Sequence, residues 1–222
     1  MGVFLSRAPK VVSEYEVREM RDSDIRLALD ELLRERHTGK LDTIIRHEVG
    51  ICAGKRRIDI AIINSEIIGY EIKSDEDTLN RLEGQAEAYG HVLDKAILVT
   101  TKRHLDSALR KLPDWWGAMI AYDKHGHICL ENARAPALND RHDAFSLAQL
   151  LWREEALEEL RLRDKSQGLS KKARYYVWIA LANAVSLDDL RSIVRARLKA
   201  RPEWPGGQPH GLCDVTHQTI TS

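Results

Sequence analysis

The stretch RRIDIAIINSEIIGYEIKSDEDTL, residues 56–79, decides the fold predicted for this chain. Apolar side chains alternate with other residues over about 57–63 and again over 67–73, which is the period of a β-strand. The three residues between these runs are polar and fit a turn, so we expect a β-hairpin. In that hairpin Asp59 on the first strand lies opposite Glu71 on the second.

One face of this hairpin is expected to carry charged groups. Side chains alternate along a strand, so Glu71 and Lys73 share a face and the bulky apolar residues occupy the other. If Ile63 pairs with Ile67, the Cβ atoms of Asp59 and Glu71 lie roughly 5 Å apart, where like charges destabilise a sheet. A bound Mg²⁺ or Mn²⁺ would remove this conflict, because hard cations take carboxylate oxygens. The small residues Ala61 and Gly69 on this face would leave room for a substrate.

The surrounding segments predict an α/β domain over residues 22–132. Helices are expected over about 24–37, 78–92 and 103–111, with Ser23 and Asp77 as N-caps of the first two. Further strands are expected over about 43–49, 95–101, 118–123 and 127–131. A long helical connection into the strand over 95–101 permits a mixed sheet flanked by helices.

Composition changes after residue 132 and indicates a small α-helical domain over 143–201. Amphipathic helices are expected over about 145–163, 170–184 and 187–199, with Ser186 beginning the last. The tail over 202–222 has no periodicity and is expected to be disordered or to form a peptide arm.

Charge and cysteine content exclude some classes of protein. The chain has 222 residues, a net charge of zero and no apolar run near the roughly 18 residues of a membrane-spanning helix. Cys52, Cys129 and Cys213 are widely spaced, which suggests neither a disulfide framework nor a zinc site and fits a reducing cytoplasm. We therefore expect a cytoplasmic protein that makes no membrane contact.

The segment over about 22–101 resembles the PD-(D/E)XK, or restriction-endonuclease-like, nuclease superfamily. Asp59 followed by Glu71-x-Lys73 matches the family's acid and E-x-K motif, although Ile58 stands where a proline often precedes the acid. Gln85 and Tyr89 match a Q-x-x-x-Y motif that some members carry on the next helix, where spacing i, i+4 gives one helical face. The resemblance implies a core of helix, three strands, helix and strand.

A closer resemblance is to short bacterial and phage proteins of that superfamily with E-I-K-S-D-x-D-T-L and Q-x-x-x-Y motifs. It implies that Asp59, Glu71 and the Ile72 carbonyl bind Mg²⁺ or Mn²⁺, which would activate a water for attack on a phosphodiester. Lys73 would orient or help deprotonate that water, or offset charge on the phosphorane-like transition state. Gln85 would approach the metal site. Glu48 is a further candidate ligand, with Glu31 and Glu35 on the first helix as rivals.

Basic residues give candidates for nucleic-acid contact. Tyr89 either orients the glutamine or contacts DNA, and the loop of Lys55, Arg56 and Arg57 either holds phosphates or is a solvated turn. The C-terminal helices carry eight Lys/Arg against two Asp over residues 171–201. Arg191, Arg195 and Lys199 fall at i, i+4 and i+8 and form a basic stripe on the last helix. With Lys171, Lys172 and Arg174 this stripe either lies along a phosphate backbone, is a solvated helix face, or docks a partner or a second copy of the chain.

These features predict a metal-dependent deoxyribonuclease, in a phage or mobile-element, defence or DNA-repair context. RNA is a second substrate class, and a homodimer would suit double-strand cutting. The competing hypothesis is a nucleic-acid-binding or partner-binding module with a nuclease fold and little activity.

Overall fold

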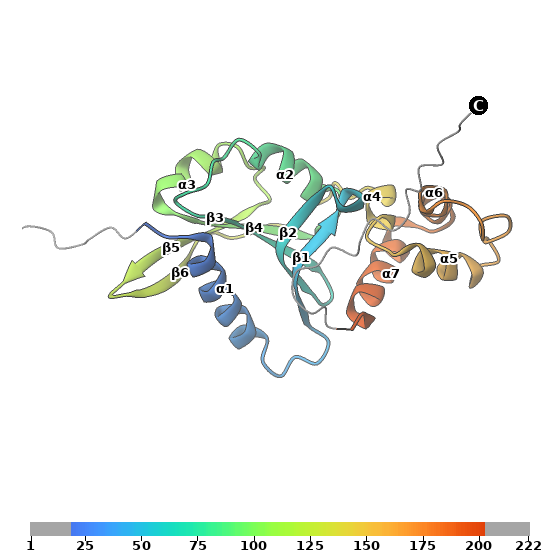
Figure 1. Cartoon of the computed structure of the whole chain (residues 1–222), viewed down its shortest axis with the longest axis horizontal. Helices are drawn as coiled ribbons and strands as arrows, with labels where there is room; N and C mark the ends of the chain where they lie inside the picture. The colour runs from blue at the N-terminus through green and yellow to red at the C-terminus, as the bar shows by residue number, and fades with distance from the viewer. Residues whose placement is uncertain (1–18, 203–222) are drawn as a thin grey trace, which may run out of the picture.

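A computed structural model describes residues 19–202, which form a six-stranded mixed sheet flanked by helices and followed by a helical C-terminal region (Figure 1). The strands lie side by side in chain order; the β3–β4 and β4–β5 pairs are parallel and the other neighbours are antiparallel. The strands are β1 (Ile44–Ile51), β2 (Arg56–Ile63), β3 (Ile67–Lys73), β4 (Lys95–Thr101), β5 (Gly117–Lys124) and β6 (His127–Arg134).

Seven α-helices and one short 3-10 helix accompany this sheet within residues 19–202. Their bounds are α1 (Asp22–His37), η1 (Cys52–Gly54), α2 (Leu82–Gly90), α3 (Lys102–Leu109), α4 (Ala144–Ala148), α5 (Arg153–Arg161), α6 (Arg174–Ala184) and α7 (Leu187–Ala200). The last four helices gather beyond β1 and β2, at one end of the molecule (Figure 1). The predicted mixed α/β class with a helical C-terminus is therefore confirmed.

The predicted hairpin is present with the expected register, because Ile63 of β2 pairs with Ile67 of β3. Both faces of the sheet are buried, however, which corrects the expectation that the bulky apolar residues occupy one face. Ile60 and Ile62 pack under α1, whereas Ala61, Ile63 and Ile67 belong to a second cluster beneath α2. A sheet covered by helices on both sides buries alternate residues on both faces.

The space beside Gly69 is filled by protein, which corrects the expectation that Ala61 and Gly69 leave room for a substrate. A Cβ atom at Gly69 would lie 2.4 Å from a Leu93 side-chain carbon and 3.2 Å from Ile58. Only glycine therefore permits this close packing between β3 and the residues that precede β4.

Two predicted helix caps are wrong. Helix α1 begins at Asp22, with Arg21 rather than Ser23 at the cap position. Helix α2 begins only at Leu82, because the Asp77 carboxylate accepts hydrogen bonds from the Ser74 N–H and hydroxyl and closes the turn after β3. An aspartate that bonds to the backbone a few residues away favours a turn as readily as a helix start.

The helix predicted over 145–163 is two helices, α4 and α5. The chain becomes extended at Trp152, whose N–H donates to Glu155 Oε2 at 2.7 Å. Arg201 fixes this break, since its guanidinium donates to the Leu150 carbonyl at 2.8 Å and lies 4.4 Å from the Trp152 ring centroid. The apolar spacing did not indicate this break, because Leu147, Leu150 and Leu151 are buried all the same.

The hydrophobic core continues from the sheet into the C-terminal helices. One cluster runs from Ile51 and Ile58 through Trp116 to Leu157 and Leu198. The predicted domain limits, 22–132 and 143–201, stay a prediction, and all but Pro202 of the tail predicted over 202–222 lies outside the described residues. None of the helices in residues 19–202 combines the length and the apolar composition of a membrane-spanning segment.

Candidate functional site

The residues predicted for the acidic site lie together where β2, β3 and α2 meet. Regular pairing of β2 with β3 ends at Ile60 and Tyr70, and the next carboxylate, Asp59, reaches across to accept a hydrogen bond from the Ile72 N–H at 2.8 Å. Asp59 and Glu71 are therefore neighbours, as the register predicted.

Glu71 is the centre of this cluster and is only 2% exposed. Its Oε1 accepts from Lys73 Nζ and Gln85 Nε2, each at 2.5 Å, and its Oε2 accepts from the Tyr89 hydroxyl at 2.5 Å. Burial, with the nearby charge of Asp59, raises the pKa of the Glu71 carboxyl, and the bonds from Lys73 and Tyr89 oppose that rise. The predicted set of Glu71, Lys73, Gln85 and Tyr89 is thus one hydrogen-bonded unit.

Tyr89 orients Glu71 rather than presenting a surface to nucleic acid. Its side chain is fully buried and stacks on Trp116 at 5.4 Å between ring centroids. Its hydroxyl lies 2.8 Å from the Arg57 carbonyl as well as 2.5 Å from Glu71. Burial and the neighbouring Glu71 charge raise the pKa of the Tyr89 phenol, so the hydroxyl stays protonated and can donate.

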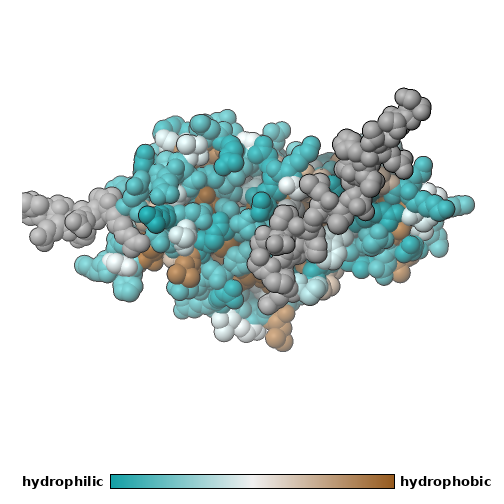
Figure 2. Space-filling model, in the orientation of Figure 1, coloured by the Kyte–Doolittle hydropathy of each residue, from teal (hydrophilic) through white to brown (hydrophobic). Residues whose placement is uncertain are grey.

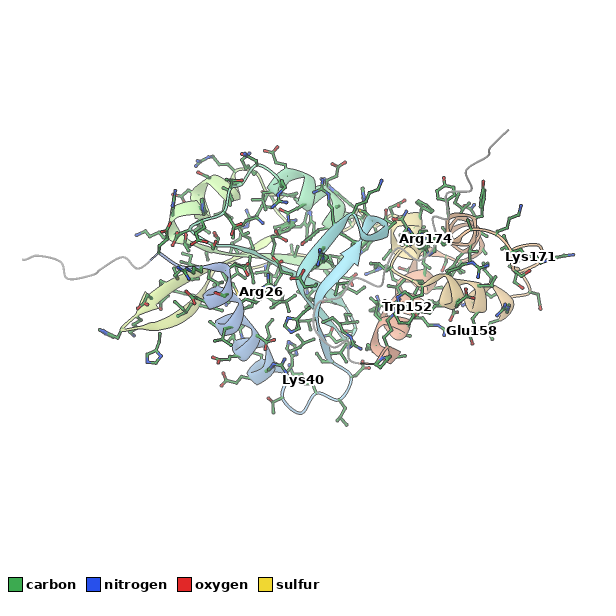
Figure 3. All side chains as sticks on the ribbon, viewed as in Figure 1. Arg26, Lys40, Trp152, Glu158, Lys171 and Arg174 are labelled. Carbon is green, nitrogen blue, oxygen red and sulfur yellow. The ribbon has the colours of Figure 1, made fainter. Side chains whose placement is uncertain are left out.

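Arg26 is a member of the site that the sequence analysis missed. It extends from α1 toward the sheet (Figure 3), and its guanidinium lies 3.1 Å from Asp59 Oδ1 and 3.2 Å from Glu48 Oε1. Burial by itself would lower the pKa of Arg26. Its hydrogen bonds to Asp22 and Asp59 outweigh that effect and raise the pKa above its ordinary value. The i, i+4 pair of Asp22 and Arg26 was visible in the sequence and indicated only a helical surface pair.

The predicted cation ligands already have protein partners. Glu48, at a left-handed backbone position with φ 53°, binds both Arg26 and Arg57, the latter at 3.3 Å. Both oxygens of Asp59 and both of Glu71 accept hydrogen bonds. Across residues 19–202 no group of three or more His, Cys, Asp or Glu side chains is arranged to hold a metal ion.

The donor set therefore fits Mg²⁺ or Mn²⁺ poorly, since hard cations need open carboxylate oxygens. One oxygen does favour a bound cation: Gln85 Oε1 is buried without a hydrogen-bond partner among the described residues. Cation binding at Asp59, Glu71, the Ile72 carbonyl and Glu48 stays a prediction, and it would require Arg26 to move. The rival acids Glu31 and Glu35 are exposed on α1.

The basic loop before β2 is not a uniform phosphate site. Arg57 is bound to Glu48, and the Arg56 guanidinium lies over the start of α2, close to Gly84. Lys55, Arg56 and Arg57 are all exposed. A phosphate contact by this loop stays a prediction.

The predicted basic stripe on α7 faces inward in part. Arg191 binds the carboxylate of Asp94, which is 2% exposed and precedes β4. Asp94 also accepts from the Ile67 N–H at 2.7 Å, and His142 Nε2 lies 3.3 Å from it. Arg195 reaches Ser192 on its own helix at 3.0 Å. Arg191 therefore joins α7 to the sheet, and nucleic-acid contact by Arg191 or Arg195 stays a prediction.

Lys171, Lys172 and Arg174 are different, because all three are exposed at the start of α6. Lys171 lies at the end of the molecule farthest from the sheet, and Arg174 lies on α6 itself (Figure 3). None of the three forms an ion pair with another residue in 19–202. Their charge is open to an outside partner, as is that of Lys55 and Arg56 in the loop before β2.

Comparison with known proteins identifies the family. The sequence model of the bacteriophage P4 protein cII family matches residues 16–203, so the chain belongs to that family. Protein cII of Enterobacteria phage P4 is 25% identical over 183 residues, which cover 82% of this chain and 68% of the phage protein. The SPO1766 protein of unknown function from Silicibacter pomeroyi shares 16% identity at a TM-score of 0.42, over 70% of this chain and 99% of that one. Such a score supports no statement about fold or function.

Family membership corrects the central predictions made from the acidic motif. Assignment to the PD-(D/E)XK nuclease superfamily is wrong, and the predicted metal-dependent deoxyribonuclease activity is wrong with it. The motif residues do meet in space, but Arg26 and Lys73 neutralise the acids internally. Acids and a lysine that meet in space do not by themselves define a nuclease, because similar side-chain arrangements occur in proteins of different function.

Proposed function

We propose that this chain is a phage regulatory protein that acts by binding nucleic acid without cleaving it. DNA is the expected partner, and RNA is the second. Kinship with protein cII of Enterobacteria phage P4 supports the phage setting. The observation that carries the binding proposal is the exposed, unpaired charge of Lys171, Lys172 and Arg174, called here the α6 basic edge.

The charge distribution around this edge favours a polyanion. Residues 165–187 contain four Lys/Arg and no Asp or Glu, although the whole chain is neutral. Helix α6 has no acidic residue in its first turn and no side-chain cap, so its free N–H groups add to the positive potential there. Lysine and arginine contacts to phosphates release counterions, which drives binding to nucleic acid.

The acidic cluster supports a binding role rather than chemistry. Its carboxylates are held by Arg26, Lys73, Gln85 and Tyr89, an arrangement that fixes α1 and α2 on the sheet. In this proposal the sheet is a rigid support for the C-terminal helices.

The finer fold prediction belongs to the same proposal. We propose that α1–β1–β2–β3–α2–β4 forms a restriction-endonuclease-like core that serves as a scaffold and lacks the enzyme's activity; the element order supports this. A cytoplasmic location and a homodimer are consistent with a regulator that binds DNA.

Binding can be tested by fluorescence anisotropy with labelled double- and single-stranded DNA and RNA over a range of salt concentrations. A variant with Lys171→Ala, Lys172→Ala and Arg174→Ala is expected to bind more weakly. The slope of log K against log salt concentration should become less negative by roughly 2 to 3, since about one phosphate contact is lost per residue. The matched control removes three exposed lysines from the rest of the chain: Lys40→Ala, Lys102→Ala and Lys124→Ala.

The proposal fails if the wild-type chain binds none of these nucleic acids at low salt. It also fails if the control variant loses as much affinity as the α6 variant. Circular dichroism of both variants would show that each is folded.

A further inference from the structure

Two consecutive tyrosines lie exposed beside the α6 basic edge. Tyr175 is 53% exposed and Tyr176 is 56% exposed, in the first turn of α6. Large aromatic side chains ordinarily contribute to a core, so an adjacent exposed pair indicates an interaction surface. The other exposed aromatic residues within 19–202, Tyr122 and Trp152, lie on β5 and at the break before α5.

The rings form an ordered group. The Tyr175 and Tyr176 centroids are 5.6 Å apart at an interplanar angle of 82°, and Tyr175 meets Phe145 edge-on at 5.5 Å. Lys172 Nζ lies 5.8 Å from the centroid of Tyr176. A lysine ammonium therefore lies beside an exposed aromatic ring on this surface.

The protein holds these groups in place. Arg153, at the start of α5, donates to the carbonyls of Ser170 and Lys172 at 2.5 and 3.1 Å. Arg174 lies 5.3 Å from the ring centroid of the buried Trp178. The segment that carries the cations is thus fixed before any partner binds, and prior order reduces the entropic cost of binding.

We propose that this surface binds single-stranded nucleic acid, with unpaired bases stacked on Tyr175 and Tyr176 and phosphates held by Lys171, Lys172 and Arg174. The inference rests on the proposed function and names its ligand class. In a duplex each base face is covered by its neighbours, so exposed rings can stack only on unpaired or terminal bases. Aromatic residues interleaved with basic ones are the general means of binding single strands without sequence preference.

The charge of the surface favours nucleic acid over a protein partner. The stretch without acids, residues 165–187, carries Lys165 in addition to the α6 basic edge. The wider face of the molecule is mostly hydrophilic, with small separate hydrophobic areas (Figure 2). A polyanion with flat apolar groups satisfies both the cations and the rings, whereas a peptide of acidic residues alone satisfies only the cations.

The test compares three labelled ligands by fluorescence anisotropy: a mixed-sequence single strand, the same strand annealed to its complement, and an abasic strand of equal length. The abasic strand keeps the phosphates and lacks the bases. Wild-type protein should bind the single strand most tightly. Tyr175→Ala with Tyr176→Ala should weaken single-strand binding by about 5-fold or more for each ring and leave abasic binding unchanged.

Two matched variants isolate the stacking. Tyr175→Phe with Tyr176→Phe keeps both rings and should bind the single strand like the wild type. Tyr122→Ala removes an exposed tyrosine from β5 and should also bind normally.

Equal affinity for the abasic and base-carrying strands would overturn the inference and leave the proposed function standing. So would wild-type affinity in the double alanine variant, or competition by polyglutamate as effective as competition by the single strand. No binding of any ligand by the wild-type chain would instead overturn the proposed function itself.

Discussion

Arg26 reaches carboxylates from three elements: Asp22 on its own helix, Glu48 on β1 and Asp59 on β2. Two acids close together in a partly buried site repel each other unless a cation lies between them. A divalent metal between Asp59 and Glu71 was predicted for that role, whereas in the structure a guanidinium lies between Asp59 and Glu48. The difference cannot be read from residue spacing, since Arg26 and Asp59 lie far apart along the chain.

Replacement of Arg26 by methionine tests this arrangement. Arg26→Met keeps most of the side-chain volume and leaves Asp59 and Glu48 without their shared cation. The free energy of unfolding should fall by about 1 to 3 kcal/mol, the cost of removing a charged hydrogen-bond partner. Urea denaturation at pH 7 measures the loss, and Arg36→Met, an exposed arginine on the same helix, is the control.

The same variant tests the cation prediction. In the wild-type chain Mn²⁺ must displace Arg26 to reach Asp59 Oδ1 and Glu48 Oε1, whereas in Arg26→Met these two oxygens have lost their guanidinium partner. A gain in the variant alone would indicate that Arg26 occupies the cation position. A gain in the wild type would support the predicted metal site.

At the scale of the elements, Asp94 connects the sheet to the C-terminal helices. It is bound by the Ile67 N–H of β3 and by Arg191 of α7, and His142 from the connecting segment lies beside it. Burial by itself would raise the pKa of Asp94, but the nearby His142 and the hydrogen bonds from the Ile67 N–H and Arg191 lower it to about 2. The ionised form is thus stabilised in the folded protein.

This depressed pKa predicts a dependence of stability on pH. A carboxyl whose folded pKa lies below its unfolded value of 3.8 stabilises the fold above that value, and the contribution is lost as the pH falls through about 2. Asp94→Asn should therefore lower the free energy of unfolding by about 2 kcal/mol at pH 7. The difference from wild type should shrink between about pH 4 and pH 2.

Thermal denaturation across this pH range makes the measurement. The matched control is Asp188→Asn, which removes the other carboxylate bound to Arg191 but is 90% exposed in its side chain. An equal loss in both variants, or a loss in Asp94→Asn that persists at low pH, would contradict this account of the junction.

At the scale of the whole molecule, the sheet and the C-terminal helices share one hydrophobic cluster. That cluster includes Ile58 from β2, Trp116 before β5 and Trp178 from α6. Elements that share a buried core lose its contacts together, so unfolding should be cooperative. The amino-acid composition would then change at residues 132–143, but the parts on either side would unfold together.

The expected result is one unfolding transition. Far-ultraviolet circular dichroism and tryptophan fluorescence should give the same urea midpoint, because Trp115 and Trp116 lie beside the sheet whereas Trp152 and Trp178 lie in the helical region. A chain that ends at residue 142 should expose part of the cluster and bind a hydrophobic dye. Two separate midpoints would support two independent domains.

The sequence by itself determined the local structure of this protein. Alternation over 57–63 and 67–73 predicted the β2–β3 hairpin and its register, and KAILVTT predicted β4, because strand periodicity and turn residues act over a few positions. It also predicted that Asp59 lies near Glu71, and that Gln85 and Tyr89 share one helical face.

Tertiary structure decided what those residues do. Arg26 comes from α1 to neutralise Asp59 and Glu48, Leu93 fills the space beside Gly69, and Arg191 turns from the predicted basic stripe to Asp94. Each of these contacts joins segments distant in the chain, and no local pattern specifies which long-range partner a charged or apolar side chain will meet. Which charged side chains stay free to bind an outside ligand therefore becomes known only when the tertiary structure shows which ones form ion pairs within the protein.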